Sequence, residues 1–436
     1  HEGWVSRGRR GGQTDTRAIA AETLRLRHER AGLLGYGSFA DYRLEVEMAK
    51  SPAAVRDLLH AVWPPARAAA EADGAVLQEM LRGEGIEGPL RPWDWRYYAE
   101  KRRQAEHEID EAALKPFFQL DRMREAAFDC ARRLFGLEFR PVEAALHHPD
   151  ARAWDVTRNG RHMAVFIADD FARPGKRSGA WCSTLRPQSR LDGDRRPQVL
   201  NVCNFARPAA HQPALLSPDD ARTLFHEFGH ALHHILSDVT YESISGTSVA
   251  RDFVELPSQL FEHWLDVPEV LERFATHAET GAPMPAETRA RLRAAATFDM
   301  GFQTVEYVGS ALVDLELHAG PAPADPMQKQ AEVLAGIGMP EAIGMRHALP
   351  HFAHVFAGGY ASSYYSYLWA EMMDADAFAA FEEAGDPFDP GTAQALERHV
   401  LSAGGSAEPD ALYAGFRGRL PGVAALLRGR GLDRAA

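Results

Sequence analysis

A His-Glu-x-x-His pattern lies in the middle of this chain, with His226, Glu227 and His230 as its polar members. On a helix, residues four apart lie on the same face, so the two imidazoles can reach one ion while Glu227 projects beside them. Zinc binds neutral imidazole well, and a catalytic zinc keeps one coordination position open for water. The pattern therefore predicts a helical metal site. Two histidines beside an apolar stripe such as Leu224 and Phe228 could also belong to an ordinary core helix.

The start of this helix can also be read from the sequence. Ser217 suits the N-cap and Pro218 the first helical position. Asp219 and Asp220 follow in the first turn, where carboxylates complement the helix dipole. The motif then lies about two turns inside a well-capped helix, where its side chains are held rigidly.

A metal hydrolase of this kind needs a third protein ligand in addition to two histidines. Glu255 lies downstream of His230, beyond a turn at Gly246 that allows the chain to return on a second helix. Pro257 should bend or begin that second helix. The alternative interpretation of Glu255 is an exposed helical carboxylate.

These two segments together carry a family resemblance. The pairing of Phe-His-Glu-Phe-Gly-His-x-Leu-His with Asp-Phe-Val-Glu-x-Pro-Ser-Gln resembles the thimet oligopeptidase (M3) family of zinc metallopeptidases. The resemblance implies one zinc ion per chain, bound by His226, His230 and Glu255. It also implies that Glu227 is the general base that activates the attacking water.

A tyrosine-rich stretch follows Gly358-Gly359, a break at which the backbone can approach a ligand. Tyr360, Tyr364 and Tyr367 recur there at helical spacing, which usually indicates core packing. Each tyrosine hydroxyl needs a hydrogen-bond partner, however, whereas leucine fills a core without that requirement. A peptide-bond hydrolase needs donors aimed at the oxyanion of its tetrahedral intermediate. The stretch therefore predicts a substrate-binding loop.

The same stretch resembles the substrate-binding loop of the M3 family. The resemblance implies that His354, Tyr360 and Tyr367 contact the substrate and the intermediate as catalytic groups. It also implies that Tyr364 binds substrate. His351 lacks that match and could be structural.

Between residues 151 and 210 the composition changes towards strands. Asn159-Gly160 is a favoured dipeptide of a two-residue hairpin turn. Gly179-Ala180 could begin a short edge strand ahead of the metal helix, and such an edge can pair with the main chain of an extended peptide. The alternative is that these small residues merely pack closely or that a loop covers the edge.

Asp252 precedes Glu255 by about one helical turn and would share a helix face with it. It could orient a ligand histidine through a hydrogen bond. It could equally cap the helix or pair with Arg251.

We expect a mainly α fold, a multi-helix zincin-type metallopeptidase body with a small β-sheet beside the metal helix. Residues 1–150 should form a helical lobe and residues 151–210 the small β-sheet region. Residues 211–436 should form the helical catalytic region with the metal site and the tyrosine loop.

A long helix is expected early in the chain. Ser51-Pro52 should open it, and its apolar residues follow helical spacing. The pair Pro64-Pro65 should kink or break this helix, because proline lacks the backbone N–H and clashes with the preceding turn.

Composition narrows the class of protein. The net charge of the 436-residue chain is −13, so no nucleic-acid partner is expected. No apolar run approaches the roughly 20 residues of a membrane span. Three cysteines without Cys-x-x-Cys spacing suit a reducing compartment. We expect a cytoplasmic monomer whose partners are short peptide substrates, with no membrane association.

The chain begins with His1 rather than Met, and the resemblance extends from about Trp4 to Leu432. Family members carry a further helical segment before this point. We therefore expect that the chain lacks an N-terminal helical segment that forms one wall of the active-site channel.

Two peptidase activities and one binding function are compatible with these residues. The segment Ser-Gly-Thr-x-x-x-Arg-Asp-Phe-Val-Glu resembles the bacterial peptidyl-dipeptidase (dipeptidyl carboxypeptidase) branch of the family, which releases C-terminal dipeptides. An endo-acting oligopeptidase of the same family is the alternative. A non-catalytic peptide-binding protein is a third possibility, although binding alone requires no general base.

Overall fold

A computed structural model describes residues 1–108 and 111–433 of the chain, which divides into two compact units. Unit 1 comprises His1–Glu108, Ala294–Trp369 and Val423–Ala436, and unit 2 comprises Ile109–Arg293 and Ala370–Gly422. The expected mainly α fold with a small sheet is confirmed. Each compact unit is assembled from separate stretches of the chain. The expected division into three consecutive regions stays a prediction.

Unit 1 is helical. Two helices, α11 (Ala286–Ala295) and α15 (Ser366–Ala384), run from one unit into the other. The helices that lie wholly in unit 1 are α1 (Glu2–Val5), α2 (Arg17–Leu33), α3 (Phe39–Leu44), α4 (Pro52–Gly83), α5 (Trp95–His107), α12 (Met300–His318), α13 (Pro326–Gly336), α14 (Ala353–Phe356) and α18 (Val423–Gly429).

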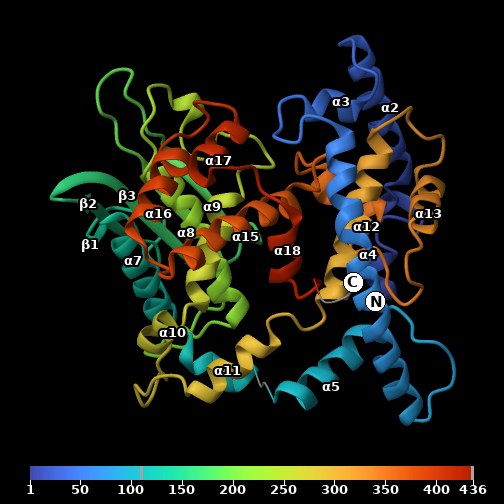
Figure 1. Ribbon diagram of the computed structural model, residues 1–436, viewed down its shortest axis with the longest axis horizontal. Coiled ribbons are helices and arrows are strands. Elements are labelled where there is room, and N and C mark those ends of the chain that lie inside the picture. Colours follow the sequence, from blue (N-terminus) through green and yellow to red (C-terminus); the bar gives the residue numbers. More distant parts are fainter. Residues whose placement is uncertain (109–110, 434–436) are drawn as a thin grey trace. The chain divides into compact units, whose positions relative to one another are not determined.

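The long helix α4 packs side by side with α12 (Figure 1). Gly301 of α12 permits this approach, because an added Cβ would lie only 2.5 Å from the backbone nitrogen of Ala70. Of the expected kink or break at Pro64-Pro65, the break is wrong, because α4 continues through both prolines. The kink stays a prediction. Residues before and after the pair are buried in the core, and this packing outweighs the backbone hydrogen bonds that proline cannot make.

Unit 2 contains a five-stranded mixed sheet of order β1-β2-β3-β5-β4. Only the β3–β5 pair is parallel. Asn159 and Gly160 both have positive φ, as the predicted two-residue hairpin between β2 and β3 requires. The strands are β1 (Glu138–Val142), β2 (Arg152–Arg158), β3 (Arg161–Phe171), β4 (Trp181–Arg186) and β5 (Gln198–Phe205).

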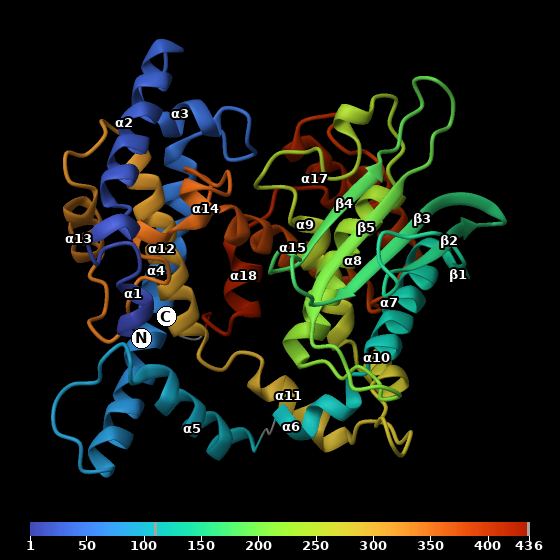
Figure 2. The same cartoon turned by 180° about the vertical axis from the view of Figure 1, so that it is seen from behind.

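The sheet packs against α8 (Figure 2). An aromatic cluster joins these layers: Phe128 stacks on Phe139 with ring centroids 4.0 Å apart, and both lie against Phe228 of α8. Within the described residues, no helix has both the length and the apolar character that crossing a membrane requires. The helices of unit 2 are α6 (Glu111–Leu114), α7 (Leu120–Phe135), α8 (Pro218–Ile235), α9 (Leu256–Glu262), α10 (Pro268–Phe274), α16 (Pro390–Leu396) and α17 (Pro409–Arg417), with a π-helix at Glu397–Leu401.

Helices α8 and α9 approach each other closely at Gly229. A Cβ added there would lie 2.4 Å from the carbonyl oxygen of Pro257 and 2.6 Å from Cα of Ser258. Both distances are shorter than any normal contact of a Cβ atom, so only glycine allows this spacing. Glu255, the N-cap of α9, is thereby brought next to α8.

The substitution Gly229→Ala tests this close approach. Ala favours the helix by up to about 1 kcal/mol over Gly, but the overpacked contact should lower the free energy of unfolding by about 1–3 kcal/mol. Urea denaturation measures the change. Gly32→Ala is the matched control, because an added Cβ there meets no heavy atom within 4 Å. A Gly229→Ala protein as stable as the control would contradict the packing argument.

Candidate functional site

The metal-site helix α8 begins as its sequence predicts. Ser217 is the N-cap, and its side chain accepts a hydrogen bond from the backbone N–H of Asp220. The carboxylate of Asp220 accepts from the backbone N–H of Ser217 in return, so the two residues form a capping box. The apolar residues Phe225 and Phe228 are buried, and this anchors the helix that carries the histidines.

The three expected metal ligands converge in unit 2. Oε2 of Glu255 lies 3.1 Å from Nε2 of His230 and 3.4 Å from Nε2 of His226. One ligand atom from each of the three residues lies within 4.8 Å of the other two. Two residues from α8 and one from the start of α9 therefore present their donor atoms to a single point.

The carboxylate of Glu255 is fixed by its own helix. The single hydroxyl proton of Ser258 is within hydrogen-bond reach of two oxygens of Glu255, its Oε2 at 3.1 Å and its backbone oxygen at 2.9 Å. Burial alone would raise the pKa of Glu255, but its contacts with His226 and His230 hold that pKa well below the ordinary value. Glu255 is thus a buried, negatively charged group rather than an exposed carboxylate.

Glu262 is a site residue that the sequence analysis missed. Oε1 of Glu262, at the end of α9, lies 2.7 Å from Nδ1 of His226. Glu255 and Glu262 both contact His226, so they share the face of α9 that is directed towards α8. A carboxylate on the outer nitrogen fixes the orientation of a ligand imidazole and increases its basicity. Helical periodicity counted onward from Glu255 would have pointed to this residue.

Glu227 has the environment of a proton acceptor. Its side chain is buried, and its Oε2 makes no hydrogen bond with any residue in the described part of the chain. Burial raises the pKa of Glu227, while the neighbouring His226 and His230 oppose that rise. A buried carboxylate with an oxygen that makes no hydrogen bond can accept a proton from a bound group and return it.

The edge of the sheet lies beside this centre. β4 is an outer strand of the sheet and packs against α8. Burial, with a smaller effect of the nearby Glu227 carboxylate, raises the pKa of the Cys182 thiol in β4. The strand begins at Trp181, so Gly179 and Ala180 precede it instead of forming its first residues. The side-chain amide of Asn204 donates to the carbonyl oxygen of Gly179 at 2.6 Å.

Asp252 is fully buried in the turn that precedes α9. Nδ1 of His230 has no hydrogen-bond partner among the residues that the structure describes, and Nδ1 of His226 is taken by Glu262. The expected role of Asp252 in orienting a ligand histidine stays a prediction.

The histidine and tyrosines of the predicted substrate loop gather in unit 1. The ring of His354 lies 6.0 Å from Tyr360, 5.4 Å from Tyr364 and 6.4 Å from Tyr367, measured between centroids. Tyr360 and Tyr367 are stacked at 5.2 Å. Tyr360 and Tyr364 lie in non-helical chain ahead of α15, which begins at Ser366, so the prediction that all three tyrosines lie on one helix is wrong. The loop fold still brings their rings together.

A buried carboxylate on α12 anchors this loop. Asp314 accepts hydrogen bonds from the backbone N–H groups of Ser362 at 2.9 Å and Tyr364 at 3.0 Å. Ser362 has a φ of 58°, a left-handed conformation that is costly for a residue other than glycine. The hydroxyl of Tyr307, also on α12, donates to the carbonyl oxygen of Tyr364 at 2.5 Å. Asp314 and Tyr307 are therefore positioning residues of the loop, and neither was assigned from the sequence.

Comparison with known proteins decides the family. The profile of peptidase family M3 matches residues 2–432. The chain belongs to peptidase family M3. The resemblance inferred from the two sequence segments is thus confirmed, and a divalent metal at His226, His230 and Glu255 agrees with a metallopeptidase family.

Curated relatives of this M3 chain carry two kinds of name. Dipeptidyl carboxypeptidase of Salmonella typhimurium is 38% identical over 438 residues, which are 98% of this chain and 64% of that protein. Oligopeptidase A of Escherichia coli is also 38% identical, over 434 residues, which are 98% of this chain and 64% of that protein. The M3 chain therefore spans less than two thirds of the length of these relatives.

Solved structures share the fold of the M3 chain. Trypanosoma cruzi metallocarboxypeptidase 1 matches with a TM-score of 0.56 and 13% identity, covering 96% of this chain and 76% of that one. The M32 carboxypeptidase of Deinococcus radiodurans matches with a TM-score of 0.51 and 15% identity, covering 94% of this chain and 72% of that one. At such low identity these matches establish the fold alone.

Removing the charge of Glu262 should weaken metal binding. We expect Glu262→Gln to lower the metal affinity of the M3 chain by about 10-fold to 100-fold, because His226 loses the carboxylate that orients it. Competition with a chromophoric chelator measures the affinity. Glu272→Gln, whose side chain is 67% exposed, is the control and should leave it unchanged. Equal affinities of the two variants would show that Glu262 does not support the metal site.

Proposed function

We propose that this chain carries the catalytic region of a zinc-dependent peptidase that hydrolyses short peptides and releases C-terminal dipeptides. One observation carries the proposal: the donor atoms of His226, His230 and Glu255 converge, and Glu227 follows the first of them on the same helix. A site that only bound peptides would need neither the ligand set nor the buried proton acceptor.

The donor set suits zinc. Two imidazoles and one carboxylate form the three-ligand set of many catalytic zinc sites, which leaves a fourth position for water. Tetrahedral zinc with bonds of about 2.0–2.2 Å separates its ligand atoms by about 3.3–3.6 Å. The separations of 3.1 Å and 3.4 Å from Oε2 of Glu255 are close to that value. We infer one zinc ion per chain.

Glu227 and Glu262 have different roles in the proposed hydrolysis. Zinc, when bound, would activate water as a nucleophile and polarise the scissile carbonyl. Glu227 accepts the proton that the attacking water loses and then delivers a proton to the leaving amine. Glu262 keeps the His226 ring in the orientation that directs Nε2 towards the metal position.

The tyrosine loop supplies the remaining proposed groups. The family resemblance assigns contacts with substrate and intermediate to His354, Tyr360 and Tyr367, and substrate binding to Tyr364. Hydroxyl and imidazole donors of this kind stabilise a developing oxyanion. The anchoring of the loop backbone by Asp314 supports this role, because preorganised donors need a fixed backbone.

The outer edge of β4 supports the proposal that the substrates are extended peptides. β4 is an outer strand beside α8, and an extended peptide can add to such an edge through main-chain hydrogen bonds. Gly179 and Ala180 lie just before β4, where a substrate backbone could approach closely because neither residue has a large side chain. The expected monomeric state, the cytoplasmic location and the lack of a nucleic-acid partner stay predictions.

Internal cleavage of peptides is the second candidate activity. Oligopeptidase A of Escherichia coli is as similar to this chain as the dipeptidyl carboxypeptidases are, at 38% identity. Overall identity therefore does not choose between the two activities. The segment that leads into Glu255 favours dipeptide release.

The substitution Glu227→Gln should remove turnover and keep the metal. We expect a loss of about 100-fold or more in kcat, because the amide cannot accept the proton, with an unchanged zinc content. Peptide hydrolysis and metal analysis are measured on the same samples. Glu269→Gln, a half-exposed carboxylate in α10, is the control. Retained turnover in Glu227→Gln would contradict the assignment of the general base.

Product analysis separates the candidate activities. The metal-loaded chain is incubated with a short peptide, and the fragments are identified by mass spectrometry. We expect successive dipeptides from the C-terminus. Internal fragments would assign the chain to the oligopeptidase activity, and a bound but uncut peptide would leave only a binding function.

A further inference from the structure

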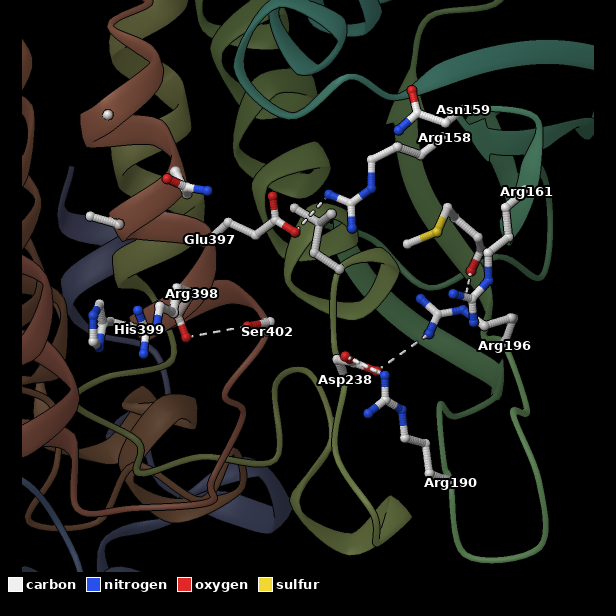
Figure 3. Close-up of a pocket in the computed structure, with 15 residues that line it drawn as sticks. Arg158, Asn159, Arg161, Arg190, Arg196, Asp238, Glu397, Arg398, His399 and Ser402 are labelled. Atoms are coloured by element: carbon white, nitrogen blue, oxygen red, sulfur yellow. Dashed lines mark hydrogen bonds and ion pairs between the residues drawn. The ribbon is translucent and has the colours of Figure 1, made fainter.

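Unit 2 contains a cavity that has no part in the proposed peptidase chemistry. Its volume is about 910 Å³, within the range of small-molecule sites. Strand residues around the β2–β3 hairpin form one wall, and residues of α16 and the following π-helix form another (Figure 3). Leu236, the C-cap of α8, also lines it, whereas none of the proposed metal ligands does.

The cavity is basic in an otherwise acidic protein. Five arginines line it, against the two carboxylates of Asp238 and Glu397, although the whole chain has a net charge of −13. A cluster of one sign in a concave site attracts ligands of the opposite sign. The arginines are Arg158, Arg161, Arg190, Arg196 and Arg398.

Arg196 is built into the wall. Its side chain is only 7% exposed, and its guanidinium donates hydrogen bonds to the carbonyl oxygens of Met163 at 2.9 Å and Ile235 at 3.0 Å. The remaining charge is balanced at longer range, since Asp194 lies 3.5 Å and Asp238 3.9 Å from the same guanidinium. The structure thus holds a buried cation in a fixed orientation at the cavity.

Three of the other four arginines pair with carboxylates that a ligand can replace, and one of the three, Arg161, pairs with Asp194. Arg158 pairs with Glu397 across the cavity at 2.6 Å, and Arg190 pairs with Asp238 at 2.5 Å (Figure 3). These partly exposed pairs contribute little stability by themselves. Arg398 makes no side-chain hydrogen bond or ion pair within the described parts of the chain, so its charge is available.

The wall that carries Glu397 and Arg398 has an unusual backbone. Glu397–Leu401 forms a π-helix directly after α16. Such turns are rare and occur frequently at functional sites. Here the turn presents Glu397, Arg398 and His399 to the cavity in succession.

We propose that this cavity binds a compact anion that carries two or more phosphate groups. The planar guanidinium matches phosphate oxygens in pairs, which favours phosphate as the recognised group. Arginines on two facing walls favour more than one phosphate. His399 is the only ring among the lining residues, so recognition depends on the phosphates rather than on stacking against a base.

Isothermal titration of the zinc-loaded chain at low ionic strength tests the proposal, with inorganic pyrophosphate as the probe. We expect one binding site per chain and weaker binding of orthophosphate. Arg158→Ala and Arg398→Ala should each weaken pyrophosphate binding by about 10-fold, the effect of losing a charge-assisted hydrogen bond. Arg140→Ala is the matched control, because Arg140 is exposed in β1 and outside the cavity.

A variant that should raise the affinity for pyrophosphate, instead of lowering it, distinguishes a direct effect on binding from a general structural effect. Glu397→Gln should tighten pyrophosphate binding, since it removes a carboxylate that competes for Arg158. Zinc content measured after each titration identifies any loss of metal to pyrophosphate. No saturable binding, or equal affinities in Arg158→Ala, Arg398→Ala and Arg140→Ala, would overturn the proposal.

A parallel titration with ADP decides whether the ligand is a nucleotide or an inorganic oligophosphate. Tighter binding of ADP than of pyrophosphate would assign the site to nucleotides and support the proposal. Equal or tighter binding of pyrophosphate would assign it to inorganic oligophosphates and support it as well.

Discussion

The convergence of the three proposed metal ligands depends on the close contact between α8 and α9 at Gly229. Two histidines on α8 can converge by helical geometry alone, but the third ligand must arrive from another segment. The missing side chain of Gly229 lets the backbone around Pro257 and Ser258 approach α8, and Glu255 is carried into range with it. Ser258 and Glu262 then fix the carboxylate and the His226 ring. The polar groups of His226, His230, Glu255 and Glu262 are tolerated in this largely buried site because each of them contacts another.

The tyrosine loop follows a related principle, in which a buried carboxylate organises irregular backbone. Asp314 accepts hydrogen bonds from the backbone N–H groups of Ser362 and Tyr364. These two hydrogen bonds offset the cost of the left-handed conformation of Ser362 and satisfy backbone donors that would otherwise be buried without a partner. In both units, residues outside the proposed catalytic set determine where the proposed site residues lie.

Charge is distributed unevenly over unit 2. The metal centre gathers carboxylates around two histidines, whereas the cavity at the far end of α8 gathers arginines. The same helix thus leads from one kind of electrostatic environment to the other. Arg196, bonded to the backbone of Ile235, connects the arginine cavity to the last turn of the helix that carries the metal ligands.

The sequence alone determined the features that depend on local geometry. Helical spacing placed His226, Glu227 and His230 together, the Ser217 cap began α8 where expected, and Asn159-Gly160 formed its hairpin. Only the tertiary structure decided the rest. Tertiary packing keeps α4 helical through Pro64-Pro65. It holds Tyr360 and Tyr364 in a non-helical conformation. It also places Glu262 in contact with His226. Local patterns specify which conformations a segment prefers, whereas contacts between distant segments are set by packing energies that no single segment contains.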